Sequence, residues 1–197
     1  MGIIYLLLLF NISCNNIQEK QSEFKRLKDK AKEAKTYCKA NKMDTSFCIL
    51  IDMKRHSGKY RFFVWDFKTD TILERGLCSH GDCGGIDIPK GEKMPYFTNQ
   101  PNSHCSSLGK YKIGTRGVSN FGIGINYKLH GLEPTNSNAF KRIIVLHSFD
   151  NLENEEIYPR ECVESWGCPT ISNQLLASID NKLQKAKQPV LLWIFND

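Results

Sequence analysis

The sequence predicts a mainly β domain, and three observations support that prediction. From Cys48 onward the apolar runs are short, rich in Ile, Val, Phe and Tyr, and separated by Gly, Asn, Pro and Asp clusters. The chain has 197 residues, of which 41% are hydrophobic, so it has room for one core of moderate size. Only one segment of this region has strong helical periodicity. We therefore expect a β-sandwich of two packed mixed sheets with one or two peripheral helices.

Seven segments have the pattern of strands, and two short turns join the first three into a meander. The segments are 48–53, 60–67, 72–78, 110–115, 122–127, 142–147 and 190–195. The helix is predicted from about Asn173 to Lys187, because Ser172 can cap its start and Pro189 would block its extension. Two long irregular stretches remain, 79–107 and 148–167, and loops of that length in a compact domain are commonly functional.

The first 13 residues have the layout of a cleaved export signal. A short apolar run is followed by Asn-Ile-Ser, so that a small residue stands directly before Cys14. This segment resembles a bacterial lipoprotein signal, which implies that Cys14 is lipidated and anchors the protein to a membrane. A plain secretory signal is the alternative. We expect an exported protein in the periplasm or at the cell surface.

Residues 14–45 are predicted to form a lysine-rich helical stalk ahead of a catalytic domain at 46–197. Phe24, Leu27, Ala31, Ala34 and Cys38 recur at helical spacing amid lysines, and we expect a solvated helix. Between Glu19 and Lys42 there are nine Lys or Arg and four Asp or Glu, so five of the six net positive charges lie here. The rest of the chain is nearly neutral, which disfavours nucleic-acid binding.

The sequence Ser165-Trp166-Gly167-Cys168-Pro169 stands at the end of the second long loop, just before the helix. The glycine permits unusual backbone geometry, and free amides near a helix start can lower a thiol pKa or hold an oxyanion. A nucleophilic cysteine also needs a base. His147 ends an apolar run, so a strand would present its imidazole where the loop returns Cys168. A buried structural cysteine and a hydrogen-bonded histidine remain the alternative.

The spacing from His147 to Ser165-Trp166-Gly167-Cys168 resembles the L,D-transpeptidase (YkuD-like) catalytic domain, in the branch with Ser-Trp-Gly-Cys-Pro. Other stretches agree in order: Ser79-His80-Gly81, Phe97-Thr98-Asn99, Ser106 to Tyr111, Gly131 to Pro134 and Arg142 to His147. The resemblance runs from about Cys48 to Asp197, and it implies the two-sheet fold of that family.

The resemblance implies acyl transfer on the peptide stems of peptidoglycan. Cys168 would form a thioester, His147 would act as general base and then general acid, and amides near Gly167 and Cys168 would hold the oxyanion. Ser165 would orient the site, whereas Trp166, His80 and Gly81 would line the substrate channel. No metal or organic cofactor is required, and we expect a monomer.

Two alternatives remain open from the sequence. A cysteine peptidase or L,D-carboxypeptidase would use the same site with water as acceptor. A non-catalytic surface lipoprotein would use Cys78, His80 and Cys83 for zinc, or a disulfide between Cys78 and Cys83. The chain has eight cysteines, and six remain if Cys14 is lipidated and Cys168 is free, so we expect disulfides, with Cys78 and Cys83 as the favoured pair.

Overall fold

A computed structural model describes residues 2–197, with side chains for residue 18 and residues 21–197. The expected signal at 1–13 and the Cys14 side chain therefore lie outside the described side chains. The helices are α1 (Gly2–Ala40), the 3₁₀ turn η1 (Pro134–Asn136) and α2 (Asn173–Lys185). The strands are β1 (Phe47–Asp52), β2 (Phe62–Asp66), β3 (Thr71–Gly76), β4 (Gly109–Val118), β5 (Ile125–Gly131), β6 (Val145–Ser148), β7 (Thr170–Ile171) and β8 (Leu191–Phe195).

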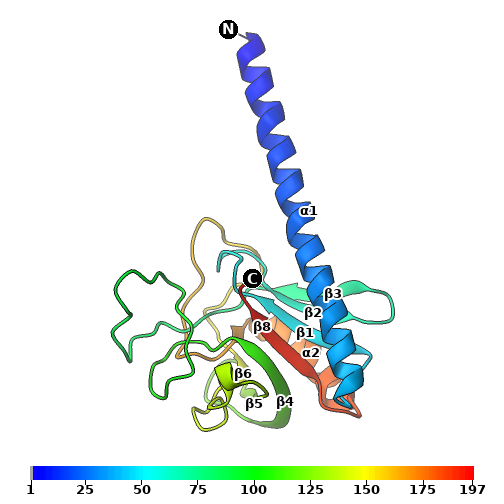
Figure 1. The fold of residues 1–197 in the computed structure, drawn as a ribbon, viewed down its shortest axis with the longest axis vertical. Helices are drawn as coiled ribbons and strands as arrows, with labels where there is room; N and C mark the ends of the chain where they lie inside the picture. Colours follow the sequence, from blue (N-terminus) through cyan, green and yellow to red (C-terminus); the bar gives the residue numbers. More distant parts are fainter. Residues whose placement is uncertain (1) are drawn as a thin grey trace.

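The mainly β class with peripheral helices is confirmed, and the seven expected strands are present within a few residues of their predicted bounds. The two halves of the expected sandwich are not separate sheets: the strands form one sheet in the order β3-β2-β1-β8-β4-β5-β6-β7. The reason is β8, which pairs in parallel with β1 on one side and antiparallel with β4 on the other. Figure 1 shows this curved sheet with α2 against it and α1 rising away from it.

The curved sheet encloses one core and offers a second apolar face. Alternation along β1 sends Ile49 and Ile51 to the core that α2 covers, while Cys48 and Leu50 point to the opposite face. The side chain of Ser172 caps α2 by accepting from Leu175 N. The helix buries the four residues expected to share a face: Leu175, Leu176, Ile179 and Leu183.

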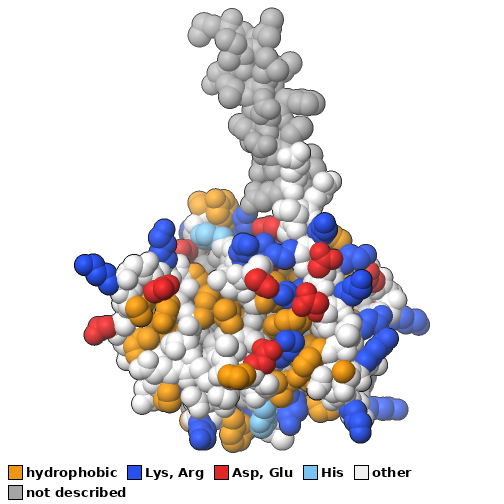
Figure 2. Space-filling model, viewed as in Figure 1, with side chains coloured by type: hydrophobic (Ala, Val, Ile, Leu, Met, Phe, Trp, Pro, Cys, Tyr) orange, Lys and Arg blue, Asp and Glu red, His pale blue; other side chains and the backbone are white. Residues whose placement is uncertain are grey.

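The expectation of a solvated stalk is wrong for the C-terminal part of α1. Leu27, Ala31, Ala34 and Cys38 occur at the predicted spacing, but all four are buried against the outer face of β1, β2 and β8. The charges of this segment are also paired across to the sheet: Arg26 contacts Asp52, and Lys30 Nζ lies 2.8 Å from a carboxylate oxygen of Asp197. Figure 2 shows positive and negative side chains interspersed around the base of α1. This part of α1 is therefore packed on the domain.

Among the described residues, no helix combines the length and the hydropathy that a bilayer crossing requires.

The expected disulfide between Cys78 and Cys83 is also wrong. Cys83 is bonded to Cys105, with the two Cα atoms 4.2 Å apart. Cys78 is instead fully buried in the core, and its thiol contacts Ser79 O. The pairing follows from the path of the loop after β3, in which Gly85 N donates to Ser103 O. The cysteines free of disulfides in residues 21–197 are Cys38, Cys48, Cys78, Cys162 and Cys168.

Candidate active site

Strands β6 and β7 bring His147 and Cys168 together from positions 21 residues apart. His147 pairs with Thr170 in a parallel ladder, so the long loop between them returns Cys168 to the end of β6. The backbone N–H of Val145 donates to Cys168 Sγ at 3.4 Å. Cys168 is partly exposed and lies, with His147, on one cavity of about 730 Å³.

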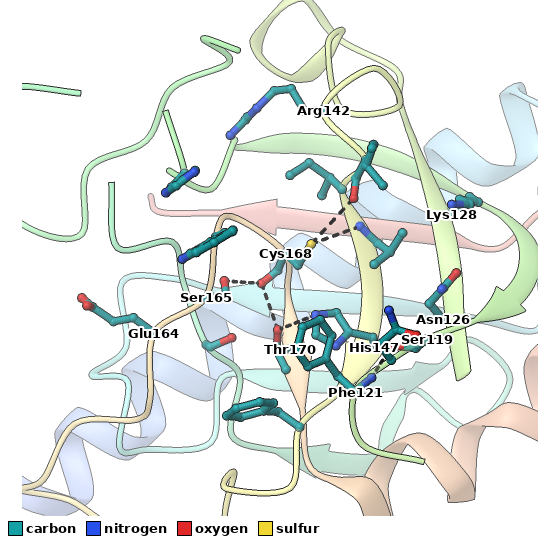
Figure 3. Close-up of a pocket in the computed structure, with 18 of the residues that line it drawn as sticks. Ser119, Phe121, Asn126, Lys128, Arg142, His147, Glu164, Ser165, Cys168 and Thr170 are labelled. Atoms are coloured by element: carbon teal, nitrogen blue, oxygen red, sulfur yellow. Dashed lines mark hydrogen bonds between the residues drawn. The ribbon is translucent and has the colours of Figure 1, made fainter. Parts of the chain in front are cut away.

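The His147 imidazole is buried and hydrogen-bonded at both nitrogens. Nδ1 lies 3.0 Å from Ser148 O, and because a carbonyl only accepts, Nδ1 carries the proton. Nε2 is then the basic nitrogen, and it accepts from Thr170 Oγ1 at 3.2 Å. The Thr170 hydroxyl also lies 3.3 Å from Cys168 O, so two acceptors compete for its single proton. Figure 3 shows Thr170 between the two side chains, with the thiol directed toward Val145 N and Ile143 O.

The electrostatics of this pair favour the neutral thiol and neutral imidazole at rest. Burial raises the pKa of Cys168, against a lowering from the Val145 amide, Arg142 and Lys128. Burial lowers the pKa of His147, partly offset by its bond to Ser148. A preformed thiolate and imidazolium pair is therefore disfavoured, and the histidine is available as a base near neutral pH.

The Ser165-Trp166-Gly167 loop is built around one left-handed residue. Gly167 has φ +96°, and a Cβ there would lie 2.6 Å from Cys105 O, so no other residue fits without a shift of the loop. Ser165 Oγ donates to Cys168 O at 2.7 Å and accepts from Gly167 N at 3.2 Å. Ser165 thus holds the backbone of Cys168, and its expected role in orienting a nucleophile stays a prediction. The Gly167 amide, expected as an oxyanion donor, is occupied by Ser165.

Trp166 is exposed and lines the cavity, and its expected contact with substrate stays a prediction. It is 72% accessible, and its indole stacks on His104 with ring centroids 4.6 Å apart and planes 6° apart. His104 was missed from the sequence, because a lone histidine in a long loop carries no pattern. The loop that carries His104 is held beside the cysteine loop by Ser106 Oγ, which donates to Gly167 O at 3.2 Å, and is tied to Cys83 through Cys105.

Arg142 is a second residue that sequence reasoning did not assign to the site. Its guanidinium donates to Ser107 Oγ at 2.7 Å and to Cys105 O at 2.6 Å, which fixes the 98–107 loop. It also lines the cavity and contributes positive potential near the Cys168 thiol. The run from Arg142 to His147 was noticed in the sequence as part of a motif, but the loop contacts of the arginine required the structure.

Two expected substrate-lining residues lie behind the cavity wall. His80 and Gly81 do not line the cavity; their backbones hold the cysteine loop, through Ser165 N donating to His80 O at 2.8 Å and a bridge between Gly81 and Ser165. His80 is buried beside Arg61. The positions matched the family pattern, but their side chains face the interior.

The zinc alternative is not supported by the arrangement of its residues. Cys83 is bonded to Cys105, so it cannot supply a thiolate beside Cys78 and His80. Within the residues that the structure describes, no group of three or more His, Cys, Asp or Glu side chains is placed to hold a metal ion. His130 stacks on Phe140, with ring centroids 4.8 Å apart, and does not line the cavity.

Comparison with protein families agrees with this geometry. The family model described as the L,D-transpeptidase catalytic domain matches residues 18–193. The chain belongs to this family. The matched region includes much of α1, in agreement with the packing of that helix on the sheet.

Solved structures that resemble the chain include two bacterial proteins. One is Bd1075 of Bdellovibrio bacteriovorus, at 15% identity and TM-score 0.47, covering 77% of this chain and 48% of that one. The other is the L,D-transpeptidase of Xylanimonas cellulosilytica, at 11% identity and TM-score 0.42, covering 76% of this chain and 60% of that one. The chain thus spans about half to three fifths of these structures. No curated protein sequence matches it.

Proposed function

We propose that the protein is an L,D-transpeptidase that transfers acyl groups between peptidoglycan stem peptides through a thioester on Cys168. The family supports the reaction class. The observation that supports the mechanism is the partly exposed Cys168 thiol on the same cavity as His147, whose unprotonated Nε2 faces the Thr170 hydroxyl.

In the first half-reaction, the Cys168 thiol rotates toward His147, loses its proton to Nε2 and attacks a stem carbonyl. The C–N bond to the terminal residue breaks, and His147 returns the proton to the leaving amine. The Cys168 backbone amide supplies an oxyanion donor, and one such donor contributes about 3 kcal/mol in comparable sites.

In the second half-reaction, an amine of another stem attacks the thioester. Its proton passes to His147, the C–S bond breaks, and His147 reprotonates the departing Cys168 thiolate as the new amide forms. If water attacks instead, the product is a free acid and the enzyme is an L,D-carboxypeptidase. Supplying a labelled amine acceptor and measuring the ratio of amide to acid product distinguishes the two outcomes.

The catalytic pair is tested by intact mass after exposure to a carbapenem and by turnover of a stem tetrapeptide. We expect Cys168→Ala to abolish both the mass increase and turnover while the fold is retained, because the residue lies on a loop. We expect His147→Ala to lower the acylation rate by about 10² to 10⁴, the usual scale for a lost general base.

The pH dependence of the acylation rate distinguishes the proposed role of Cys168 as nucleophile from that of His147 as base. In the unaltered protein, acylation should rise as His147 loses its proton, at a pKa below its ordinary value near 6.5, and should then level off. In His147→Ala, the residual rate should keep rising toward high pH as the thiol ionises unaided. His130→Ala is the matched histidine control. Acylation that persists in Cys168→Ala would refute the mechanism.

We further propose that the protein is exported and lipid-anchored through Cys14, on the strength of the sequence pattern at 1–14. The expected result is that the mature protein begins at a diacylated Cys14, and that Cys14→Ser releases it from the membrane fraction. A mature chain that retains residues 1–13 would contradict this proposal.

A further inference from the structure

Ile143, which lines the cavity beside Cys168, has a backbone conformation that isoleucine rarely adopts. Its φ is +59°, in the left-handed region. A β-branched side chain crowds the backbone there, whereas glycine and asparagine adopt this region readily. Among the residues that the structure describes, Ile143 is the only β-branched one with a positive φ. Strained residues of this kind are concentrated at functional sites.

The left-handed turn at Ile143 is imposed by its two neighbours. The Arg142 guanidinium donates to Ser107 Oγ at 2.7 Å, which fixes its side chain. On the other side, Ile144 is only 4% exposed in the core, and its carbonyl oxygen accepts from Leu129 N at 3.2 Å. Because the chain is fixed on both sides, any residue at position 143 must turn in this way. Glycine or asparagine would do so with less strain.

The isoleucine side chain at this position is not required by the core. It is 67% exposed, and it lines the same cavity as Cys168 and His147. Val163 and Trp166 are also exposed on this cavity, so part of its wall is apolar. An exposed apolar side chain on a strained backbone adds little to the stability of the free protein, and its use is therefore expected to be contact with a ligand.

The position of Ile143 beside the thiol indicates which part of a ligand it contacts. Its carbonyl oxygen lies 3.9 Å from Cys168 Sγ, and the Val145 N–H donates to the same sulfur at 3.4 Å. Figure 3 shows the thiol directed toward these two backbone groups. A carbonyl carbon must come within about 3–3.5 Å of the sulfur before attack. The side chain next to that carbonyl is then brought close to Ile143.

We propose that Ile143 is a specificity-determining residue whose side chain contacts the aliphatic side chain of the peptide residue that Cys168 attacks. This inference deepens the proposed function and rests on it. The contact favours a long aliphatic chain over a short one, because each methylene removed from water on binding stabilises the complex. The strain lowers the stability of the free protein, whereas the contact raises its affinity for the peptide.

The test compares two stem peptides with the full chain. One carries lysine at the attacked carbonyl, and the other carries diaminobutyrate, which keeps the amine on a shorter aliphatic chain. We expect kcat/KM for acylation of Cys168 to be about three- to tenfold higher with lysine in the unaltered protein. In Ile143→Asn this preference should disappear, while Tm should rise by about 2–4 °C because asparagine relieves the strained backbone.

Alkylation of Cys168 by iodoacetamide separates a ligand contact from a structural effect. Its rate should be unchanged in Ile143→Asn, because this small reagent does not need the side-chain contact. Ile143→Val keeps the strain and most of the contact, so it should keep the Tm and most of the preference. Leu132→Asn removes an apolar side chain that is 39% exposed and does not line the cavity, so it should change neither the preference nor the alkylation rate.

Failure of this proposal can be told from failure of the proposed function. If the peptides acylate Cys168 without a preference for lysine, or if Ile143→Asn keeps that preference, the specificity assignment is overturned and the transpeptidase mechanism stands. A lower Tm in Ile143→Asn, or a loss of alkylation as large as the loss of acylation, would also overturn it, because the side chain would then serve the fold. If neither peptide acylates Cys168 in the unaltered protein, the proposed function fails and this assignment fails with it.

Discussion

Replacing His80 by Gln should remove part of the acid sensitivity of the fold. His80 is buried, and its pKa of about 4 lies far below the ordinary value near 6.5, mainly because burial disfavours the charged ring and secondly because Arg61 repels it. The unfolded chain takes up this proton near pH 6.5, but the folded protein does so only near pH 4. The contribution of neutral His80 to the free energy of unfolding is therefore fully present above pH 6.5 and is lost as the pH falls toward 4.

The size of this effect follows from the two pKa values. At pH 4.5 the unfolded histidine is almost fully protonated and the folded one is still mostly neutral, which costs about 2 kcal/mol of unfolding free energy relative to pH 7. His147 adds to the loss in the same direction, because its pKa is also lowered. The lowered pKa values of Asp66 and Asp180 act below about pH 4, outside this window.

The assay is urea unfolding of the unaltered protein and of His80→Gln at pH 7 and pH 4.5. Glutamine retains an oxygen that can accept from Arg61, so the variant should fold, and Tm at pH 7 checks that it does. The drop in unfolding free energy between the two pH values should be smaller in the variant by about 2 kcal/mol. Equal drops in the two proteins would refute the reasoning.

Two further substitutions test the cysteine loop and the packing of α1. Gly167→Ala should lower the acylation rate of Cys168 by about 100-fold, because its Cβ would meet Cys105 O at 2.6 Å and displace the nucleophile; an unchanged rate by intact mass would contradict this. Leu27→Ala should lower the unfolding free energy by about 2–5 kcal/mol in urea, because Leu27 is 3% exposed, while folded protein keeps its acylation rate. A loss below 0.5 kcal/mol would instead favour the solvated stalk.

The core elements and the placement of His147 and Cys168 on one cavity could be predicted because their signals are local. The apolar run before His147 indicates a strand, and the Gly167-Cys168-Pro169 turn before a capped helix indicates where the loop returns. The parallel pairing of β6 with β7 then brings Cys168 to the end of β6. Strand β7 itself was not predicted, because it has only two residues, Thr170 and Ile171.

The environment of α1 was predicted wrongly although its buried positions were identified. The helical spacing of Leu27 and Cys38 identifies the buried face of α1, but it does not identify the part of the protein that covers this face. The signal that could have located its partner is β1, where the run from Phe47 to Ile51 is apolar at every position, and such a strand must be covered on both faces. One face is covered by the core, which leaves the other for a helix.

The supporting residues of the site could not be predicted, because they depend on contacts between loops distant in sequence. Arg142 reaches Ser107, and Cys83 reaches Cys105, only after two long loops have taken their final paths. His80 matched a family pattern, but the sequence does not reveal that Arg61 would occupy its Nδ1 and turn the side chain inward.

The protonation states of Cys168 and His147 before reaction follow from the burial of both side chains. The raised pKa of the thiol and the lowered pKa of the imidazole disfavour a thiolate at rest, so in the mechanism that we propose Cys168 becomes nucleophilic only when His147 takes its proton during attack. The positive charges of Arg142 and Lys128 lower the pKa of the thiol and therefore the cost of that transfer. Arg142 is held in place by Ser107 and Cys105, so in the proposed mechanism it supplies a constant part of the field that stabilises the thiolate.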